Sequence, residues 1–220
     1  MATKKTEVIE IKPIEITKVN LRVVGDTSLI MHAWDEKAKI MIVKPGTIKP
    51  KKQRNPVEEF INSMYWLTEK PDIDDDMNEE ECEKLFCEAI KKGARFGFPA
   101  TAFIQAAISA AYRMGWSKDK VSLRGAFFIE ADDNGLIEIK SDVPEMREDM
   151  VKIGMGTASV RYRGEFKNWC ADLTILYNKN GNCSIGDIIN IINAGGYVCG
   201  VGEWRPEIDG QYGMYHVQAN

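Results

Sequence analysis

The stretch "CGVGEWRPEIDGQYGMYHV" (199–217), near the end of the chain, decides the fold that we expect. It contains glycines at positions 200, 202, 210 and 213, and it ends in an apolar, aromatic segment that predicts a strand. Glycines let a loop take positive φ and let another backbone approach closely, and the N–H groups of such a loop can contact an anion. Because the stretch follows a predicted helix and precedes a strand, it is neither a dinucleotide-binding motif nor a P-loop.

Working outward from this terminal strand, the hydrophobic pattern predicts an α+β protein. The expected elements, in chain order, are a strand over 14–34 bent at Gly25, a helix over 95–115, a hairpin over 120–131 and 135–141, an irregular stretch over 144–166, a strand over 166–178, a helix over 184–196 closed by two glycines, and the terminal strand. This order is close to that of ferredoxin-like and RRM-type domains, elaborated by an insertion and an extra strand. Such domains carry their helices on one face of an antiparallel sheet. In that fold the last strand lies beside the first, so the turn over 200–212 should meet residues 32–36.

A single domain over residues 1–220 is expected, with an insertion over 44–93. A length of 220 residues suits one large domain. The insertion joins a basic loop to two predicted helices, over 55–69 and 71–93, the second after an acidic linker. The net charge of −4 is unevenly divided, since residues 1–56 hold twelve Lys and Arg against six Asp and Glu, whereas residues 57–92 hold four against twelve.

Several classes of protein and site are not expected. No apolar run approaches the roughly 20 residues of a membrane span, and the N-terminal lysines are not followed by the apolar region of a secretory signal. The five cysteines form no CxxC pair, and there are only two histidines, so we expect reduced thiols and no metal site. We therefore expect a cytoplasmic protein without a metal or cofactor.

Basic and aromatic residues outside the predicted core are the candidate binding residues. The loop "VKPGTIKPKKQRNP" (43–56) carries five cations and no acid, which suits phosphate contacts, although a solvated surface loop is the alternative. Trp34 and Trp204 are expected close together, either as stacking faces for bases or packed on one another. The full set of candidates is Lys44, Lys49, Lys51, Lys52, Arg54, Arg147, Lys152, Arg161, Arg163, Arg205, Trp34, Trp204, Gly200 and Gly202.

Three stretches resemble the RAMP superfamily of CRISPR-associated proteins, the Cas5, Cas6 and Cas7 group. The segment "GVGEWRPEIDGQYGMYHV" (200–217) is similar to the glycine-rich loop that ends those proteins, "GFPATAFIQAAISAAYR" (97–113) to the start of their first conserved helix, and "LRVVGDTSLIMHAW" (21–34) to their first strand. The lysine of the helix pattern is missing here, where Ile104 or Gln105 stands near its place. The chain also resembles small bacteriophage proteins that share "VGDTxLIxHAW", "MREDMVxxGMGTAxxRYR" and "GVGEWRPE". The resemblance implies a Cas7-like or RRM-like fold, a phage or prophage origin, and binding of RNA or single-stranded DNA, with self-association into a repeating assembly.

The leading hypothesis is a non-enzymatic protein that binds single-stranded RNA or DNA. A second hypothesis is an interaction protein, acting in phage assembly or against a host defence complex, whose acidic insertion docks a basic partner or occupies a nucleic-acid channel. A third is a metal-independent ribonuclease in which His32 and Asp35 perform acid and base steps and Arg205 stabilises a phosphorane.

Overall fold

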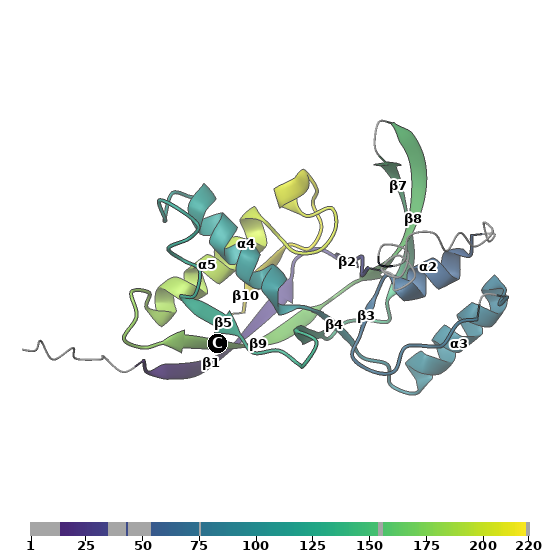
Figure 1. The fold of residues 1–220 in the computed structure, drawn as a ribbon, viewed down its shortest axis with the longest axis horizontal. Coiled ribbons are helices and arrows are strands. Elements are labelled where there is room, and N and C mark those ends of the chain that lie inside the picture. Colours follow the sequence, from purple (N-terminus) through teal and green to yellow (C-terminus); the bar gives the residue numbers. More distant parts are fainter. Residues whose placement is uncertain (1–13, 35–42, 44–53, 75, 154–155, 219–220) are drawn as a thin grey trace, which may run out of the picture.

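The structure is a computed structural model that describes residues 14–34, 43, 54–74, 76–153 and 156–218 (Figure 1). The described part is mixed α+β, with antiparallel sheets and four α-helices, as the sequence predicted. The helices are α2 (Pro56–Asn62), α3 (Glu79–Lys91), α4 (Ala100–Arg113) and α5 (Ile185–Val198), and a short 3-10 helix covers Pro206–Ile208.

The largest sheet joins the two ends of the described chain. Its strands lie in the order β10 (Tyr215–Val217), β1 (Ile16–Gly25), β9 (Cys170–Asn178) and β5 (Phe127–Ile129), and all neighbours are antiparallel. The pairing of Val23 with Val217 and of Gly25 with Tyr215 confirms that the last strand lies beside the first. Figure 1 shows α4 and α5 together on one side of this sheet.

Two smaller sheets correct the predicted pairing. The first is β2 (Leu29–Met31), β8 (Thr157–Phe166) and β7 (Glu145–Ile153), and the second is β3 (Tyr65–Trp66), β4 (Phe96–Pro99) and β6 (Leu136–Ile139). The stretch over 144–166, predicted to be irregular, is therefore a β7–β8 hairpin, in which Arg147 pairs with Glu165 and Arg163 with Asp149 across the strands. The predicted hairpin of β5 with β6 is wrong, because β5 pairs with β9 and β6 pairs with β4.

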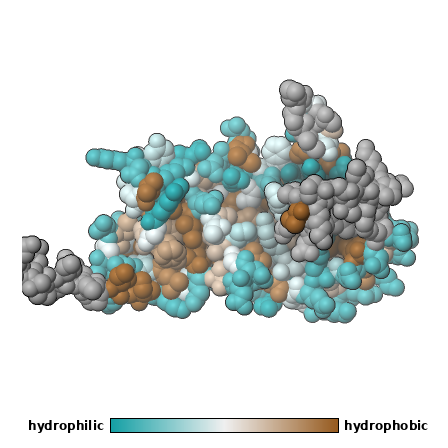
Figure 2. Space-filling view, viewed as in Figure 1, coloured by the Kyte–Doolittle hydropathy of each residue, from teal (hydrophilic) through white to brown (hydrophobic). Residues whose placement is uncertain are grey.

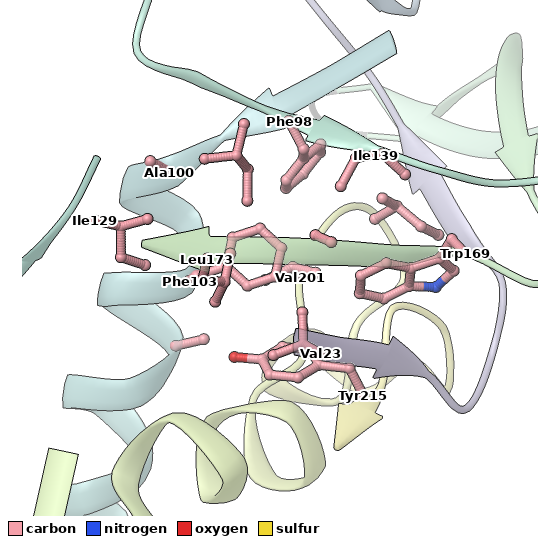
Figure 3. Packing of buried hydrophobic residues seen from close by; sticks show 14 of the residues in the cluster. Val23, Phe98, Ala100, Phe103, Ile129, Ile139, Trp169, Leu173, Val201 and Tyr215 are labelled. Atoms are coloured by element: carbon pink, nitrogen blue, oxygen red, sulfur yellow. The ribbon is translucent and has the colours of Figure 1, made fainter. Parts of the chain in front are cut away.

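The core lies between the large sheet and the helices (Figure 3). Phe103 of α4 packs against Trp169 and Tyr215, with ring centroids 6.4 and 5.4 Å away. Helix α5 continues through Gly195 and Gly196, where the sequence predicted its end. A Cβ at Gly196 would lie 1.9 Å from the carbonyl oxygen of Tyr215, so these glycines allow close packing rather than ending the helix.

The region over 54–93 begins with a well-capped helix. The Asn55 side chain accepts from the amides of Val57 and Glu58 at the start of α2, as the Asn-Pro start predicted. The helix ends at Asn62, earlier than predicted. Phe60 and Ile61 belong to the same hydrophobic cluster as the large sheet, so α2 packs on the core.

Candidate nucleic-acid interface

The glycine-rich loop over 200–213 is bound closely to the start of the molecule. Gly202 and Gly213 both have positive φ, of 82° and 65°. A Cβ at Gly202 would lie 2.5 Å from the carbonyl oxygen of Ile30, and one at Gly213 would lie 1.7 Å from that of Val201. The amide of Gly213 donates to the Ser28 carbonyl at 2.8 Å. These two glycines therefore serve close packing of one backbone on another, and the Gly213 amide is not free for an anion.

Arg163 is the centre of a buried ion-pair network. Its guanidinium donates to His32 Nδ1 at 3.1 Å and to Asp149 at 3.2 Å, and it lies 3.3 Å from Glu203. The side chain is 8% exposed and that of Asp149 is 6% exposed. Arg163 thus ties β8 to β7, to the chain that follows β2 and to the glycine-rich loop. Its prediction as a surface phosphate contact is corrected, because partners within the protein occupy the guanidinium.

Arg147 extends this network to the surface. It donates to Asp149 at 2.8 Å and to Glu165 at 3.4 Å, and its guanidinium lies 4.5 Å from the ring centroid of Tyr212. Burial acts to lower the pKa of Arg147, but hydrogen bonds to Asp149 and Tyr212 outweigh it and raise that pKa. The stacked pair of Arg147 and Tyr212 therefore joins the hairpin to the loop over 200–213.

Arg54 is at the end of the basic loop and lies on the face of the hairpin opposite to Arg147 and Arg163. Its guanidinium forms a bidentate ion pair with the Glu59 carboxylate, donates to the Val160 carbonyl and lies 5.8 Å from the ring centroid of Tyr162. About half of the Arg54 side chain stays exposed. The loop lysines 44, 49, 51 and 52, and Asp35, lie outside the described residues.

Lys152 and Arg161 are hairpin cations whose side chains make no hydrogen bond or ion pair with the described residues. Lys152 is exposed on β7, and Arg161 is half-buried on β8 opposite Asp149. Figure 1 shows the hairpin extending beyond the rest of the described fold. We call Arg147, Lys152, Arg161 and Arg163, together with Tyr212 of the loop, the hairpin–loop seam.

Arg205 and the two candidate tryptophans are arranged differently from the expectation. Arg205 donates to the Gly202 carbonyl at 3.0 Å and to Glu207 at 3.2 and 3.1 Å. Trp34 is largely exposed, whereas Trp204 is half-buried. Within the described residues these two tryptophans make no ring contact with each other. The mutual packing of Trp34 on Trp204, one of the two expected arrangements, is therefore not formed.

A cavity of about 210 Å³ lies where the end of the first strands, the start of α4 and the glycine-rich loop meet. Its lining includes His32, Gln105, Glu203 and Arg205. Burial, and then the charge of Arg163, lower the pKa of the His32 imidazole. Because His32 Nδ1 accepts from Arg163, the proton of the neutral ring is assigned to Nε2, so this nitrogen is a donor rather than a base. The geometry of His32 does not suit the base role in the ribonuclease hypothesis.

The open face of the large sheet offers little to a nucleic acid. Its basic side chains are paired, Arg22 and Lys140 with Asp172, and Lys18 with Glu130. The Asp172 carboxylate, hydrogen-bonded to Arg22 and then to Lys140, has a pKa far below its usual value. Phe128 is the large exposed aromatic of β5 on this side. An RRM-type platform with aromatic side chains on the central strands is not present on β1 and β9.

Reasoning from the sequence missed the acidic and aromatic partners of the seam. Asp149, Tyr162, Glu203 and Tyr212 were not singled out, although "VRYRGEF" (160–166) alternates basic and other side chains as a strand does. Recognising that alternation would have predicted β8 and the alternation of Arg161 and Arg163 with Tyr162 across its two faces.

No family model matches this chain, and no relative was found among curated proteins. Among the described residues, no group of three or more His, Cys, Asp or Glu side chains is placed to hold a metal ion. In the same part of the chain, no helix combines the length and apolar character needed to cross a membrane. The fold and the seam define the chain as an antiparallel α+β protein whose projecting hairpin takes part in two arginine–tyrosine contacts, Arg147 with Tyr212 and Arg54 with Tyr162.

Proposed function

We propose that this protein binds single-stranded RNA or DNA, without catalysis, along the hairpin–loop seam. We propose also a ferredoxin-like core. The strand order β10-β1-β9-β5, with α4 following β1 and α5 following β9 in the chain, supports that topology. Membership of the RAMP superfamily, origin in a bacteriophage and a cytoplasmic location remain part of the proposal and rest on the sequence alone.

The observation that carries the proposal is the meeting of separate basic segments at one hairpin. Arg54, which ends the basic loop, contacts β8, and Arg147 of β7 stacks on Tyr212 of the glycine-rich loop. Arg161 and Lys152 lie on the same hairpin, and neither is held by an ion pair with the described residues. Cations that follow a phosphate backbone, next to aromatic rings, are the two components of binding to single strands.

The buried network gives the seam its rigidity. Arg163 and Asp149 hold the two strands and the loop in fixed relation, so the backbone that carries the exposed cations does not have to be ordered on binding. Lys152 and Arg54 would contact phosphates on one face of the hairpin and Arg161 on the other, where Tyr212 would offer part of a stacking surface. Affinity would then come mainly from counterion release and would fall as salt rises.

The test is fluorescence anisotropy of labelled oligo(U) and oligo(dT) at low and moderate salt. We expect saturable binding that Lys152→Gln/Arg161→Gln weakens by about tenfold or more, with a log–log salt slope reduced by about 1.4 for two lost phosphate contacts. The control Lys91→Gln/Lys92→Gln removes two charges from the end of α3, away from the hairpin, and should change affinity less than about twofold. Absence of binding at low salt, or equal losses in both variants, would overturn the proposal.

A second candidate function is an interaction protein. It is favoured by the exposed surface of α3, which carries Glu79, Glu80 and Glu83, while Cys82 and Phe86 of the same helix are buried. This face suits a basic partner protein, such as a component of a host defence complex. A pull-down that retains its partner after nuclease treatment, and loses it in Glu80→Lys/Glu83→Lys, would favour this candidate over the first.

A further inference from the structure

A wide apolar groove lies on the helical side of the molecule, apart from the hairpin–loop seam. It is formed by the end of α4, the segment that follows it and α5, and its volume of about 730 Å³ lies within the range of ligand pockets. Met114, Leu123, Ile191 and Val198 are among its lining residues. Figure 2 shows hydrophobic side chains among hydrophilic ones over this region.

Large apolar side chains at this groove stay in contact with solvent. Tyr197 is 74% exposed and Trp116 is 53% exposed, and Met114 and the neighbouring Tyr112 are exposed as well. The helices are already packed through other residues, since Ala107 of α4 meets Gly195 of α5. The exposed groups are therefore not needed to hold α4 to α5, and an apolar patch of this kind marks an interaction surface.

The charges beside the groove define what fits it. Arg113 is ion-paired with Glu207. The segment that follows it, over 114–124, contains Lys118, Lys120 and Arg124 but one acid, Asp119, so this wall is basic on a chain of net charge −4. On the other wall Asp187 is held by the cap of α5, where it contacts Ser184. A second copy of the chain would bring two such basic walls together, so charge complementarity favours an acidic occupant.

We propose that the groove binds an acidic amphipathic helix of a partner protein. A concave groove lined by methionine, aromatic and aliphatic side chains accepts the apolar ridge of a helix, and the basic wall contacts the carboxylates that flank that ridge. Trp116 and Tyr197 are the anchors of this surface, because both are large and exposed at its edge. This inference goes beyond nucleic-acid binding, and it uses none of the seam residues.

The protein contains its own reporter for the test. Cys183 lines the groove and is partly exposed, whereas Cys87 is exposed on α3 and serves as an internal control. The probe is a peptide of about 16 residues with leucines at i, i+3, i+4 and i+7 and glutamates at the other positions. The control peptide has a lysine in place of every glutamate. The alkylation rate of each thiol by iodoacetamide is measured by mass spectrometry of the digested protein.

We expect the glutamate peptide to slow alkylation of Cys183 at least fivefold without changing Cys87, and the lysine peptide to need at least tenfold higher concentration. Tyr197→Glu should abolish the protection, because it removes an anchor and repels the glutamates, and Phe128→Glu, an exposed change on the sheet, should leave it intact. Equal protection by both peptides, no protection, or protection that survives in Tyr197→Glu would overturn the proposal. So would protection by oligo(U), or a concentration-dependent dimer that Tyr197→Glu dissociates, since these assign the groove to nucleic acid or to a second copy. Loss of oligonucleotide binding at the seam would leave this result unchanged, so the two proposals fail separately.

Discussion

Replacing Arg163 by methionine tests whether this arginine stabilises the fold or serves as a phosphate contact. Arg163 lies on β8 with 8% of its side chain exposed, and its partners come from three other segments of the chain. Methionine keeps much of the side-chain length but removes the charge and every donor. The change therefore leaves Asp149, which is 6% exposed, without one of its two arginines.

The expected loss can be worked out from the burial of the partners. Removing one partner of a buried ion pair costs about 3–5 kcal/mol. Because Arg147 still donates to Asp149 at 2.8 Å, the loss should lie near the lower end, at about 3 kcal/mol. Glu203 is 35% exposed and can be solvated, so its lost contact adds little.

Urea denaturation followed by circular dichroism measures this loss in the free energy of unfolding. The matched control is Arg161→Met, two residues earlier on the same face of β8 but half-buried, which should cost less than about 1 kcal/mol. The double variant Arg163→Met/Asp149→Leu should recover part of the loss, because it no longer buries a poorly paired carboxylate. A loss below about 1 kcal/mol for Arg163→Met, or no recovery in the double variant, would refute the assignment of a buried network.

Two further variants test the loop and the histidine. Gly213→Ala should cost more than about 3 kcal/mol, since its φ of 65° is strained for alanine and its Cβ would lie 1.7 Å from the Val201 oxygen. Gly93→Ala, at a φ of 83° with no atom within 4 Å, should cost only about 1 kcal/mol, and equal losses on thermal denaturation would contradict the packing role of Gly213. The pKa of His32 is lowered in the folded state, so the unfolded chain binds the proton first as the pH falls. The free energy of unfolding should therefore decrease as the pH drops below about 6.5, by up to about 1.4 kcal/mol per pH unit, until the lowered pKa is passed. His32→Gln, which keeps an acceptor for Arg163, should lack this component between pH 7.5 and 5.5, and an identical decline in both proteins would show that another group causes it.

Elements with local signals were predicted well. The cap of α2, the alanine-rich face of α4, the start of α5 and the alternating β9 all follow from residues close together in the chain. The hairpin of β7 and β8 was missed because its alternate positions carry charge, which by sequence alone resembles a solvated loop. Those charges are tolerated in strands because carboxylates from β7 and from the glycine-rich loop neutralise them.

For the candidate site, too, one feature was predicted from the sequence and others were not. The sequence predicted that the terminal loop and the first strand meet, and the pairing of β10 with β1 confirms it. It could not predict that Arg163 would be buried, because His32, its partner, is 131 residues away in the chain. The apolar groove was likewise invisible, since Met114 and Trp116 follow α4 and Tyr197 lies on α5, far away in the chain.

The sequence by itself determined the α+β class and the strong helices, because propensity, capping and hydrophobic period act over a few residues. The order of these elements, by analogy with a known topology, predicted that the two chain ends meet. Only the tertiary structure decided which arginines are buried, which glycines separate two backbones and which apolar side chains are left uncovered. Those properties depend on contacts between segments more than a hundred residues apart, and no local pattern records whether such a contact is made.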